Sequence, residues 1–300
     1  MARKRSIFYK IRRMGQVIAH DLAGKEFVSK LYFKHLLGYS LNLKDPKTFN
    51  EKLQWLKLYA WPNEPKAIQC ADKYAVRSYI EDRGKGEILN DILYVWEDAD
   101  QIRWEELPEQ FVLKCNHGCG YNIICTDKSK LDEKATNKLL RKWMGEDFSK
   151  FNAEPHYSKI PRRIICEKYL GDNVINYNIY CLNGKATFFS VAGGLGDGVE
   201  EHLTYYNADG TVAAFKNRSY PAKAEPLSPL LQSMIQMAES LAVDFPMVRV
   251  DLFDIDGRII LSEMTFTPGG ALIPIDPVEA DKLLGEKLDI SELTKKKNEA

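Results

Sequence analysis

The stretch RVDLFDIDGRIILSEMT, residues 249–265, restricts the fold of this chain more than any other part of the sequence. Polar and apolar residues alternate on both sides of a central DG dipeptide, which predicts two antiparallel strands joined by a tight turn. The length of the turn decides which side chains share a face. A two-residue loop puts Asp251 opposite Ser262 and turns Glu263 away. A three-residue loop with a left-handed Gly257 puts Glu263 across from Arg249 and diagonal to Asp251.

The three-residue loop gives a face that carries one arginine, two carboxylates and the hydroxyl of Thr265. Oxygen ligands of this kind suit a hard divalent cation, and Mg²⁺ usually takes one or two carboxylates together with substrate phosphates. The same pattern is also typical of an exposed hairpin whose charged face is merely solvated. The hairpin alone therefore leaves both interpretations open.

A second stretch, FVLKCNHGCGYN at residues 111–122, combines an apolar strand that carries Lys114 with a glycine-bearing turn. Gly118 and Gly120 allow backbone N–H groups to approach a phosphate closely, and a lysine on a strand adds a fixed charge. The spacing is not that of a Walker loop, which needs GxxxxGK[ST] before a helix. His117 would either contact phosphate or cap the turn. Taken alone, the stretch fits an ordinary hairpin equally well.

Composition narrows the class of protein. Among 300 residues, 45% are apolar and 28% charged, which is ordinary globular usage. Lys+Arg 42 equals Asp+Glu 42, so we do not expect a general nucleic-acid binder. The six cysteines include no CxxC pair and indicate reduced thiols in a cytoplasmic protein. We expect neither a secretory signal nor a membrane-spanning segment.

The first 20 residues are a feature of their own. Basic residues crowd the first 13 positions, and Ile7, Phe8, Ile11, Met14 and Ile18 recur at helical spacing. Such a helix either lies on an anionic membrane surface or packs its apolar stripe against the body of the protein. A single short helix binds membranes weakly, which favours packing slightly.

Periodicity and turn signals predict an α+β fold in which antiparallel sheet outweighs βαβ units. We expect helices at 26–37, 46–58, 72–80, 132–144 and 229–241. We expect strands at 88–95, 110–115, 121–126, 163–169, 176–181, 186–191, 248–253 and 258–263. The polar residues after 288 are expected to fray.

Taken in order, these features resemble the ATP-grasp superfamily and, within it, the TupA-like family named for teichuronopeptide biosynthesis. The resemblance rests on FNEKLQW at 49–55, DKYAVR at 72–77, FVLKCNHGCGYN at 111–122, EKYL at 167–170 and VDLFDIDGRIILSEMTFTPGG at 250–270. Five ordered motifs are more specific than any one of them. They favour the functional interpretation of both stretches described above.

The resemblance implies an α+β ATP-grasp fold, in which two lobes with antiparallel sheets grip ATP between them. It implies a helical segment at 1–70, a first lobe with the phosphate loop at 71–165, a second lobe with the hinge and metal hairpin at 166–288, and a polar tail at 289–300. Superfamily members usually begin with a Rossmann-like lobe that helps to bind the carboxylate substrate. In this chain that lobe looks absent or replaced.

The resemblance also implies roles for individual residues. ATP phosphates would be contacted by Lys73, Lys114, Asn116, His117, Gly118, Cys119 and Gly120. The hinge residues Glu167, Lys168, Tyr169 and Leu170 would hold adenine, largely through backbone groups at Lys168 and Leu170, with Asp172 at the ribose. Asp251 and Glu263 match the magnesium carboxylates, and Thr265 stands where most of the superfamily has an asparagine as third ligand. Arg249 matches the arginine that steadies the transferring phosphoryl group, and with Lys114 it is the expected catalytic residue.

The implied activity is an ADP-forming ligation of a carboxylate to an amine, with ATP and Mg²⁺ as cofactors. The family context suggests bacterial surface polysaccharide synthesis, in which an amino acid or amine is joined to a uronic acid. The enzyme would then be cytoplasmic, with peripheral association at the inner face of the membrane through residues 1–20. Relatives are expected to carry an acidic and a basic residue at Asn176 and Asn178, so the acceptor side is expected to differ here.

The main alternative is a glycosyltransferase of capsule or teichuronic acid synthesis. It predicts sugar-nucleotide binding without ATP turnover, with Asp254-Ile255-Asp256 as a DxD-like metal motif. A nucleotide-binding scaffold without chemistry is the other, and the intact set of Lys114, Arg249, Asp251 and Glu263 disfavours it.

Overall fold

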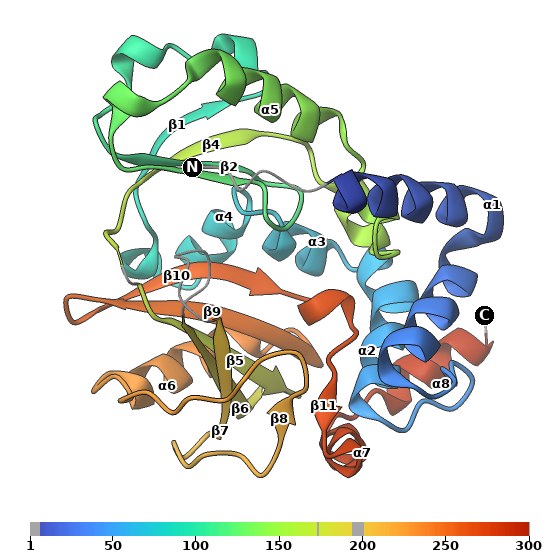
Figure 1. The fold of residues 1–300 in the computed structure, drawn as a ribbon. Coiled ribbons are helices and arrows are strands. Elements are labelled where there is room, and N and C mark those ends of the chain that lie inside the picture. Colours follow the sequence, from blue (N-terminus) through green and yellow to red (C-terminus); the bar gives the residue numbers. More distant parts are fainter. Residues whose placement is uncertain (1–6, 173, 194–200, 300) are drawn as a thin grey trace.

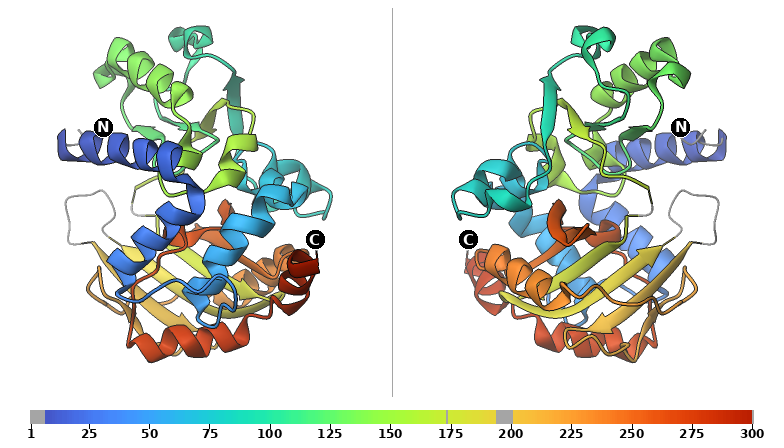
Figure 2. Two further views of the ribbon diagram at one scale, coloured as in Figure 1. Left: turned by 90° about the vertical axis from the view of Figure 1, so that its right-hand side faces the viewer. Right: turned by 90° about the vertical axis from the view of Figure 1, so that its left-hand side faces the viewer.

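Two antiparallel sheets face one another and are the framework of the molecule (Figure 1). The computed structural model describes residues 7–172, 174–193 and 201–299, with only the backbone for 7–12 and 298. The first sheet has the strand order β1-β4-β2-β3 and the second β10-β9-β5-β6-β7, while β11 and β8 make a small third sheet. Helix α5 covers the outer face of the first sheet, and α6 covers that of the second (Figures 1 and 2). The predicted α+β class is confirmed.

The helices in the described part of the chain are α1 Ile7–Leu37, α2 Phe49–Trp55, α3 Pro65–Ala71, α4 Val76–Glu81, α5 Glu133–Gly145, α6 Leu231–Ala242, α7 Val278–Lys287 and α8 Ser291–Glu299. The strands are β1 Ile92–Trp96, β2 Phe111–Cys115, β3 Asn122–Cys125, β4 Ile164–Lys168, β5 Asn176–Leu182, β6 Lys185–Gly193, β7 His202–Asn207, β8 Lys216–Asn217, β9 Met247–Ile255, β10 Arg258–Thr265 and β11 Ile275–Asp276.

The first sheet shows how alternation in the sequence separates core from site. Along β2, Phe111 and Leu113 are buried and join a hydrophobic cluster with Leu140 and Trp143 of α5. Successive residues of a strand point to opposite faces, so Lys114 points toward the second sheet. The core that stabilises this lobe thereby holds the lysine in place.

The larger core extends beyond the predicted lobe boundary. Phe49 of α2 and Tyr79 of α4 belong to the same buried cluster as the strands of the second sheet. Helices on both sides of residue 71 therefore pack with that sheet, and no change of core marks the predicted boundary. The first lobe has its own core from about residue 99 onward.

Lys57 fastens this helical region to the rest of the chain. Its side chain is fully buried, and its Nζ donates to the carbonyls of Asn152 at 2.9 Å and Gly270 at 3.2 Å. Burial lowers the pKa of this lysine to about 8. A buried amine is tolerated here because two backbone carbonyls accept its hydrogen bonds.

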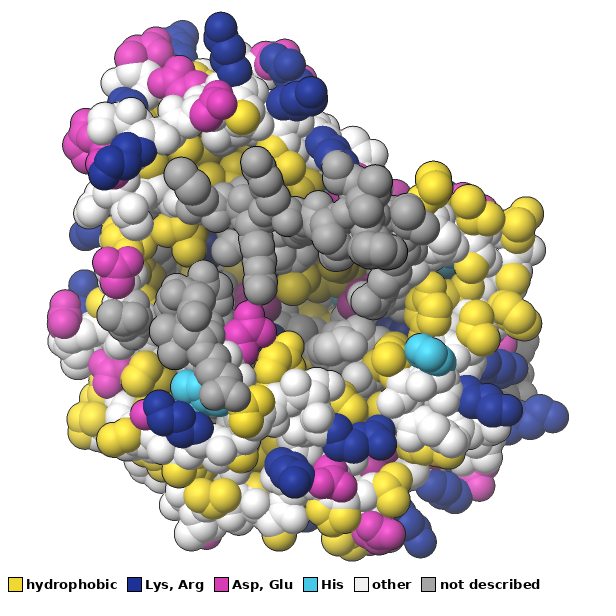
Figure 3. Space-filling model, viewed as in Figure 1, with side chains coloured by type: hydrophobic (Ala, Val, Ile, Leu, Met, Phe, Trp, Pro, Cys, Tyr) yellow, Lys and Arg dark blue, Asp and Glu magenta, His cyan; other side chains and the backbone are white. Residues whose placement is uncertain are grey.

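Helix α1 includes both helices predicted near the N-terminus, with a kink at Gly24, where φ is 78°. Its side chains Met14, Ile18 and Leu22 are exposed, and Figure 3 shows apolar side chains gathered over this helix. Residues 1–6 and the side chains of 7–12, which carry most of the predicted basic pattern, lie outside the described part. No described helix is both long and apolar enough to cross a membrane.

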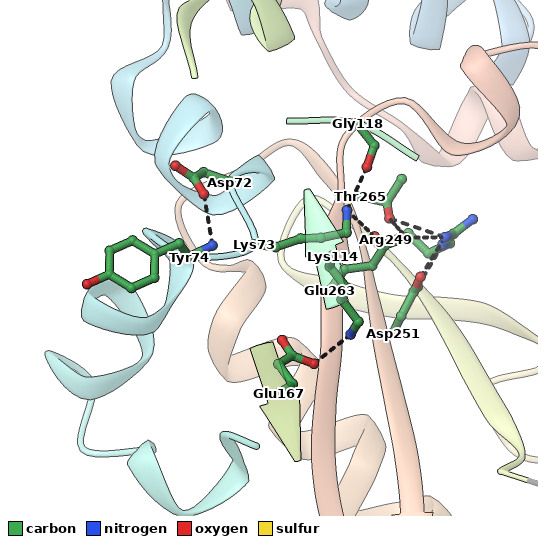
Figure 4. A network of polar contacts seen from close by, with 10 residues as sticks. All are labelled: Asp72, Lys73, Tyr74, Lys114, Gly118, Glu167, Arg249, Asp251, Glu263 and Thr265. Carbon is green, nitrogen blue, oxygen red and sulfur yellow. Dashed lines mark hydrogen bonds and ion pairs between the residues drawn. The ribbon is translucent and has the colours of Figure 1, made fainter. Parts of the chain in front are cut away.

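Two local predictions were wrong. The polar residues after 288 form helix α8 instead of fraying. Asp72 does not begin a helix; it ends α3, and its Oδ1 accepts from the N–H of Tyr74 at 2.8 Å before α4 begins at Val76. This turn points Lys73 between the two sheets (Figure 4).

Candidate functional site

The β9–β10 hairpin closes with a two-residue turn. Ile255 pairs with Arg258, and the two residues between them, Asp256 and Gly257, have φ values of 51° and 77°. Positive φ at both positions is typical of a type I′ turn, the form that matches the twist of a hairpin. The predicted three-residue loop was therefore wrong, whereas the predicted positive φ of Gly257 is confirmed.

A β-bulge restores the shared face that the short turn alone would have destroyed. The register shifts between Leu261 and Glu263, which leaves Ser262 without a partner on β9. Beyond the bulge Glu263 lies directly opposite Asp251, and Thr265 opposite Arg249. The predicted convergence of these side chains on one face is confirmed, with the carboxylates in closer register than expected.

Asp251 and Glu263 each form ion pairs with basic side chains. Arg249 donates to both oxygens of Asp251, at 2.7 and 2.5 Å, and its Nη2 lies 3.5 Å from Oε1 of Glu263 (Figure 4). Asp251 is only 1% exposed, and burial raises its pKa to about 7 even with Arg249 beside it. Burial would also raise the pKa of Glu263, but Lys73 and Arg249 lower it to about 2.

Lys73 links the two lobes across the site. Its Nζ lies 2.9 Å from Oε2 of Glu263 and donates to the carbonyl of Gly118 at 3.0 Å (Figure 4). One ammonium group thus contacts both the β9–β10 hairpin and the glycine loop after β2. Sequence reasoning placed Lys73 at phosphate; its ion pair with Glu263 had no sequence signal.

Lys114 makes a second ion pair, within the first sheet. Its Nζ lies 2.7 Å from Oε2 of Glu167 on the neighbouring strand β4. This ion pair joins β4, the strand of the predicted hinge, to the lysine predicted to contact phosphate. The pairing of β2 with β4, which crosses 50 residues of sequence, is the feature that the sequence pattern could not show.

The glycine loop after β2 is supported from below by two buried side chains. Asn116 donates to Oδ1 of Asp72 at 2.7 Å and accepts from the N–H of Arg163 at 2.7 Å. His117 is buried, its Nε2 lies 3.2 Å from the carbonyl of Trp143, and burial lowers its pKa to about 4. Both side chains form hydrogen bonds within the protein and hold the loop in place, and their predicted contact with the phosphates of ATP stays a prediction.

The tip of this loop faces solvent. Cys119 is exposed, and Gly120 has a φ of 71°. A Cβ at Gly118 would lie 2.6 Å from the ring of Phe148, so a side chain there would displace the loop. The glycines therefore allow both the close packing and the left-handed backbone.

At the predicted hinge, several groups that were expected to contact adenine or ribose form hydrogen bonds with other groups of the protein. The N–H of Lys168 donates to the carbonyl of Asp91 at 3.0 Å, and its own carbonyl accepts from Asn90 at 2.9 Å. Tyr169 donates to Asp172. The backbone N–H and carbonyl of Lys168 thus already have partners, and the contact of Leu170 with adenine stays a prediction.

Asp254 and Asp256, the carboxylates of the alternative DxD-like motif, belong to the hairpin turn and the residues beside it. Oδ2 of Asp254 accepts from Ser228 at 2.6 Å, and its Oδ1 accepts from the N–H of Gly257 at 3.1 Å. Asp256 occupies the left-handed turn position. Asp254 does not point to the face that carries Arg249 and Asp251, because it is three residues from Asp251 along β9 and therefore on the other face of the sheet.

One polar residue of this face was not predicted as a ligand-binding residue. Asn178 of β5 pairs with Asp251 of β9 and is therefore on the same face of the sheet. Alternation along residues 176–181 would have placed it on one face, but only the β5–β9 pairing shows which face. No described group of three or more His, Cys, Asp or Glu side chains is arranged to hold a metal.

Comparison with family models gives one family, described as TupA-like ATPgrasp, whose model matches residues 51–289. A comparison with curated protein sequences gave no match.

Comparison with solved structures gives several ligases. L-amino acid ligase from Bacillus licheniformis is 15% identical with a TM-score of 0.48, over 85% of this chain and 57% of the other. D-alanine–D-alanine ligase from Bacillus anthracis is 17% identical with a TM-score of 0.41, over 67% and 58%. The ATP complex of that ligase is 16% identical with a TM-score of 0.45, over 77% and 68%. The chain thus spans less than two thirds of the first two structures.

Proposed function

Since the chain belongs to the TupA-like ATP-grasp family, its fold is the ATP-grasp fold, and we propose that it is an ATP-dependent ligase that joins a carboxylate to an amine and releases ADP and phosphate. The observation that carries this proposal is the direct pairing of Asp251 with Glu263, with Arg249 and Lys73 in contact with them. Carboxylates and basic side chains that converge from the hairpin and from the turn before α4 are suited to a charged phosphoryl group.

The donor set fits Mg²⁺. Asp251 and Glu263 supply only oxygen ligands, and a hard cation with one or two carboxylates usually completes its coordination with substrate phosphates. The cation, when bound, would neutralise charge on the phosphates of ATP. Among the described residues, no group of three or more His, Cys, Asp or Glu side chains is arranged as in the usual zinc site.

The first chemical step activates the carboxylate. A carboxylate oxygen of the substrate attacks the γ-phosphorus of ATP, the bond to the β-phosphate oxygen breaks, and ADP leaves. Lys114 and Lys73 would hold the phosphates, and Arg249 would stabilise charge on the transferring group. Lys114 is on the face of the first sheet that is turned toward the second sheet, and Lys73 extends between the two sheets from the turn before α4, so both would reach a nucleotide between the lobes.

The second step forms the amide. The nitrogen of the amine attacks the acyl carbon, the bond to the phosphate oxygen breaks, and the amine proton is lost to solvent. Phosphorylation has replaced an oxide leaving group with phosphate. The protein therefore needs to supply position and charge, and no side-chain nucleophile takes part.

The substrates that we propose are a uronic acid of a surface polysaccharide and an amino acid or other amine. Support for this finer proposal comes from membership in the TupA-like family, because the resemblance described in the sequence analysis implies teichuronopeptide biosynthesis. The exposed apolar side chains of α1 next to the basic N-terminal sequence would allow peripheral contact with the inner face of the membrane.

Calorimetric titration tests the nucleotide proposal. Binding of Mg·ATP with little affinity for UDP-sugars is expected, whereas tight binding of UDP-sugars without ATP binding would overturn it in favour of a glycosyltransferase. A screen of ADP release against pairs of uronic acids and amino acids would then identify the substrates. ADP release that needs both a carboxylate and an amine is the expected result.

A further inference from the structure

Three oxygen-bearing side chains form one row across three adjacent strands. Asn178 of β5 pairs with Asp251 of β9, and Asp251 pairs with Glu263 of β10. Residues in direct register on antiparallel strands share a face, and their Cβ atoms are about 4.5–5.5 Å apart. Asp251 therefore has a carboxylate on one side and an amide on the other.

Only one of the two polar atoms of the Asn178 side-chain amide has a hydrogen-bond partner among the described residues. Its side chain is 7% exposed, and its Nδ2 donates to Oγ of Ser190 on β6 at 3.3 Å. Its Oδ1 has no hydrogen-bond partner among the described residues. Because β6 and β9 lie on opposite sides of β5, the amide branch that does not point at Ser190 is the one on the side of Asp251.

A buried amide oxygen without a partner destabilises a protein unless a donor or a cation occupies the space before it. Each such group in a folded chain calls for an explanation, and a ligand is one. Here the orphan oxygen lies beside the buried carboxylate that is expected to bind a cation. The burial of Asn178, its register with Asp251 and its unpaired Oδ1 all indicate a ligand position beside Asp251.

Thr265 is the third ligand that the resemblance implies, but its hydroxyl already forms hydrogen bonds with two other side chains of the site. Its hydroxyl donates to Oε1 of Glu263 at 3.2 Å and accepts from Nη2 of Arg249 at 3.1 Å. It also belongs to the next row of the sheet, opposite Arg249. The hydroxyl thus holds the guanidinium and the glutamate relative to one another.

We propose that Oδ1 of Asn178 is the third protein oxygen of the cation site formed by Asp251 and Glu263, in place of the hydroxyl of Thr265. The proposal rests on the proposed function, because it assigns a ligand to the cation of that site. A neutral amide adds a hard oxygen without adding charge, so the site keeps two negative charges for a divalent cation. The remaining positions are left for phosphate oxygens and water.

Mn²⁺ is the probe for this proposal, because its binding can be followed by electron paramagnetic resonance without any turnover. Affinity is measured in the presence of ADP for the wild-type protein and for Asn178→Leu, Asn178→Asp and Thr265→Val. We expect Asn178→Leu to weaken Mn²⁺ binding about tenfold, and Asn178→Asp to strengthen it by about threefold because a carboxylate replaces the amide. Thr265→Val should change it by less than about threefold.

Ser190→Ala is the matched control, since it removes the partner of Nδ2 and leaves Oδ1 in place. It should bind Mn²⁺ within about threefold of the wild type. Wild-type affinity in Asn178→Leu, or a larger loss in Thr265→Val than in Asn178→Leu, would overturn the proposal. So would weaker binding by Asn178→Asp, which is the outcome if the amide is reversed and donates to Asp251.

Two results separate this proposal from the proposed function. If the wild-type protein binds ADP and Mn²⁺ but Asn178→Leu binds them equally well, only the ligand assignment fails. If the wild-type protein binds neither, the ligase proposal fails as well. Melting temperatures establish that each variant is folded, and Asn178→Asp decides the matter should Asn178→Leu not fold.

Discussion

Arg249 binds Asp251 through two parallel hydrogen bonds, Nε to Oδ1 at 2.7 Å and Nη2 to Oδ2 at 2.5 Å. Both oxygens of the buried carboxylate therefore accept hydrogen bonds from the guanidinium. A cation that binds Asp251 competes with Arg249 for these oxygens. Binding of the proposed cation would release the guanidinium, which could then contact the charge that develops during phosphoryl transfer.

Replacement of Arg249 by alanine separates binding from chemistry. We expect kcat to fall on the order of 10³-fold, because the contact matters chiefly for charge that develops during phosphoryl transfer. The dissociation constant for Mg·ATP should stay within about threefold. Steady-state kinetics and calorimetry measure the two quantities. Arg258→Ala, at the exposed end of the same hairpin, is the control and should behave as the wild type.

Replacement of Glu263 by glutamine removes one carboxylate of the cation site and the partner of Lys73. Turnover should fall by on the order of 10³-fold or more, while Lys114 and the glycine loop retain part of the nucleotide affinity. ADP release in the presence of the correct acceptor is the measurement. Glu239→Gln on α6, which pairs with Lys185 away from the site, serves as the control. Substantial ADP formation by Glu263→Gln would contradict the assignment of this residue.

Cys119 reports on nucleotide binding without any knowledge of the substrates. It is exposed on the glycine loop, whereas the other five cysteines are buried. Alkylation of the folded protein should therefore modify Cys119 first, and slowly at neutral pH because partial desolvation by the surrounding protein and the nearby Glu263 carboxylate raise the pKa of its thiol. Mg·ATP should slow the modification at least about tenfold by closing the loop, as followed by mass spectrometry. Equal rates with and without Mg·ATP would show that the loop does not cover the nucleotide.

His156 gives the stability of the protein a dependence on pH. The ring is fully buried without a hydrogen-bond partner among the described residues, and burial lowers its pKa to about 3 from 6.5. Below pH 6.5 the unfolded chain takes up a proton that the folded protein does not, so stability is lost as the pH falls toward 3. One such group contributes about 1.4 kcal/mol per pH unit within this window.

Urea unfolding of the wild type and His156→Leu at pH 7.5, 6.5 and 5.5 measures this contribution. His117 acts in the same direction, and the raised pKa of Glu154 acts in the opposite one, but both remain in the variant. The variant should lose less stability on acidification than the wild type. Identical losses in the two proteins would mean that His156 is protonated without unfolding.

The exposed side of α1 is expected to bind anionic vesicles weakly. Leu22 is 83% exposed and follows Met14 and Ile18 along the helix. Leu22→Ser should reduce co-sedimentation with anionic vesicles and leave nucleotide binding unchanged, while Val212→Ser, at an exposed apolar residue elsewhere, should not. If the wild type sediments equally with neutral and anionic lipid, the electrostatic part of the membrane proposal is contradicted.

Sequence patterns predicted those features that depend on neighbours in the chain. Alternation located the strands of the hairpin, and the glycine at 257 indicated a left-handed residue there. The bulge at Ser262 could not be predicted, because a polar residue on a strand gives no sign in the sequence of whether it has a partner on the neighbouring strand. Asp251 and Glu263 nevertheless share a face. The two turn residues and the bulged Ser262 together leave three residues unpaired, the same number as the three-residue loop.

Contacts between distant segments could not be inferred in this way. The ion pair of Lys73 with Glu263 joins residues 190 positions apart, and the burial of His117 depends on the packing of α5 over the first sheet. In both cases the residue was noticed for its chemistry, but its partner was set by the tertiary fold. Asn178 is the clearest example, because its place beside Asp251 follows from the strand order alone.

The unpaired Ser262 has a consequence for how related chains are compared. Counted outward from the turn, Asp251 and Ser262 are equally distant, so a relative whose hairpin lacks the bulge would carry its glutamate one residue nearer the glycine. An alignment that keeps these strands free of gaps would then match that glutamate with Ser262 and report the acidic residue as lost. The gap belongs inside β10, where alignment methods are least inclined to open one.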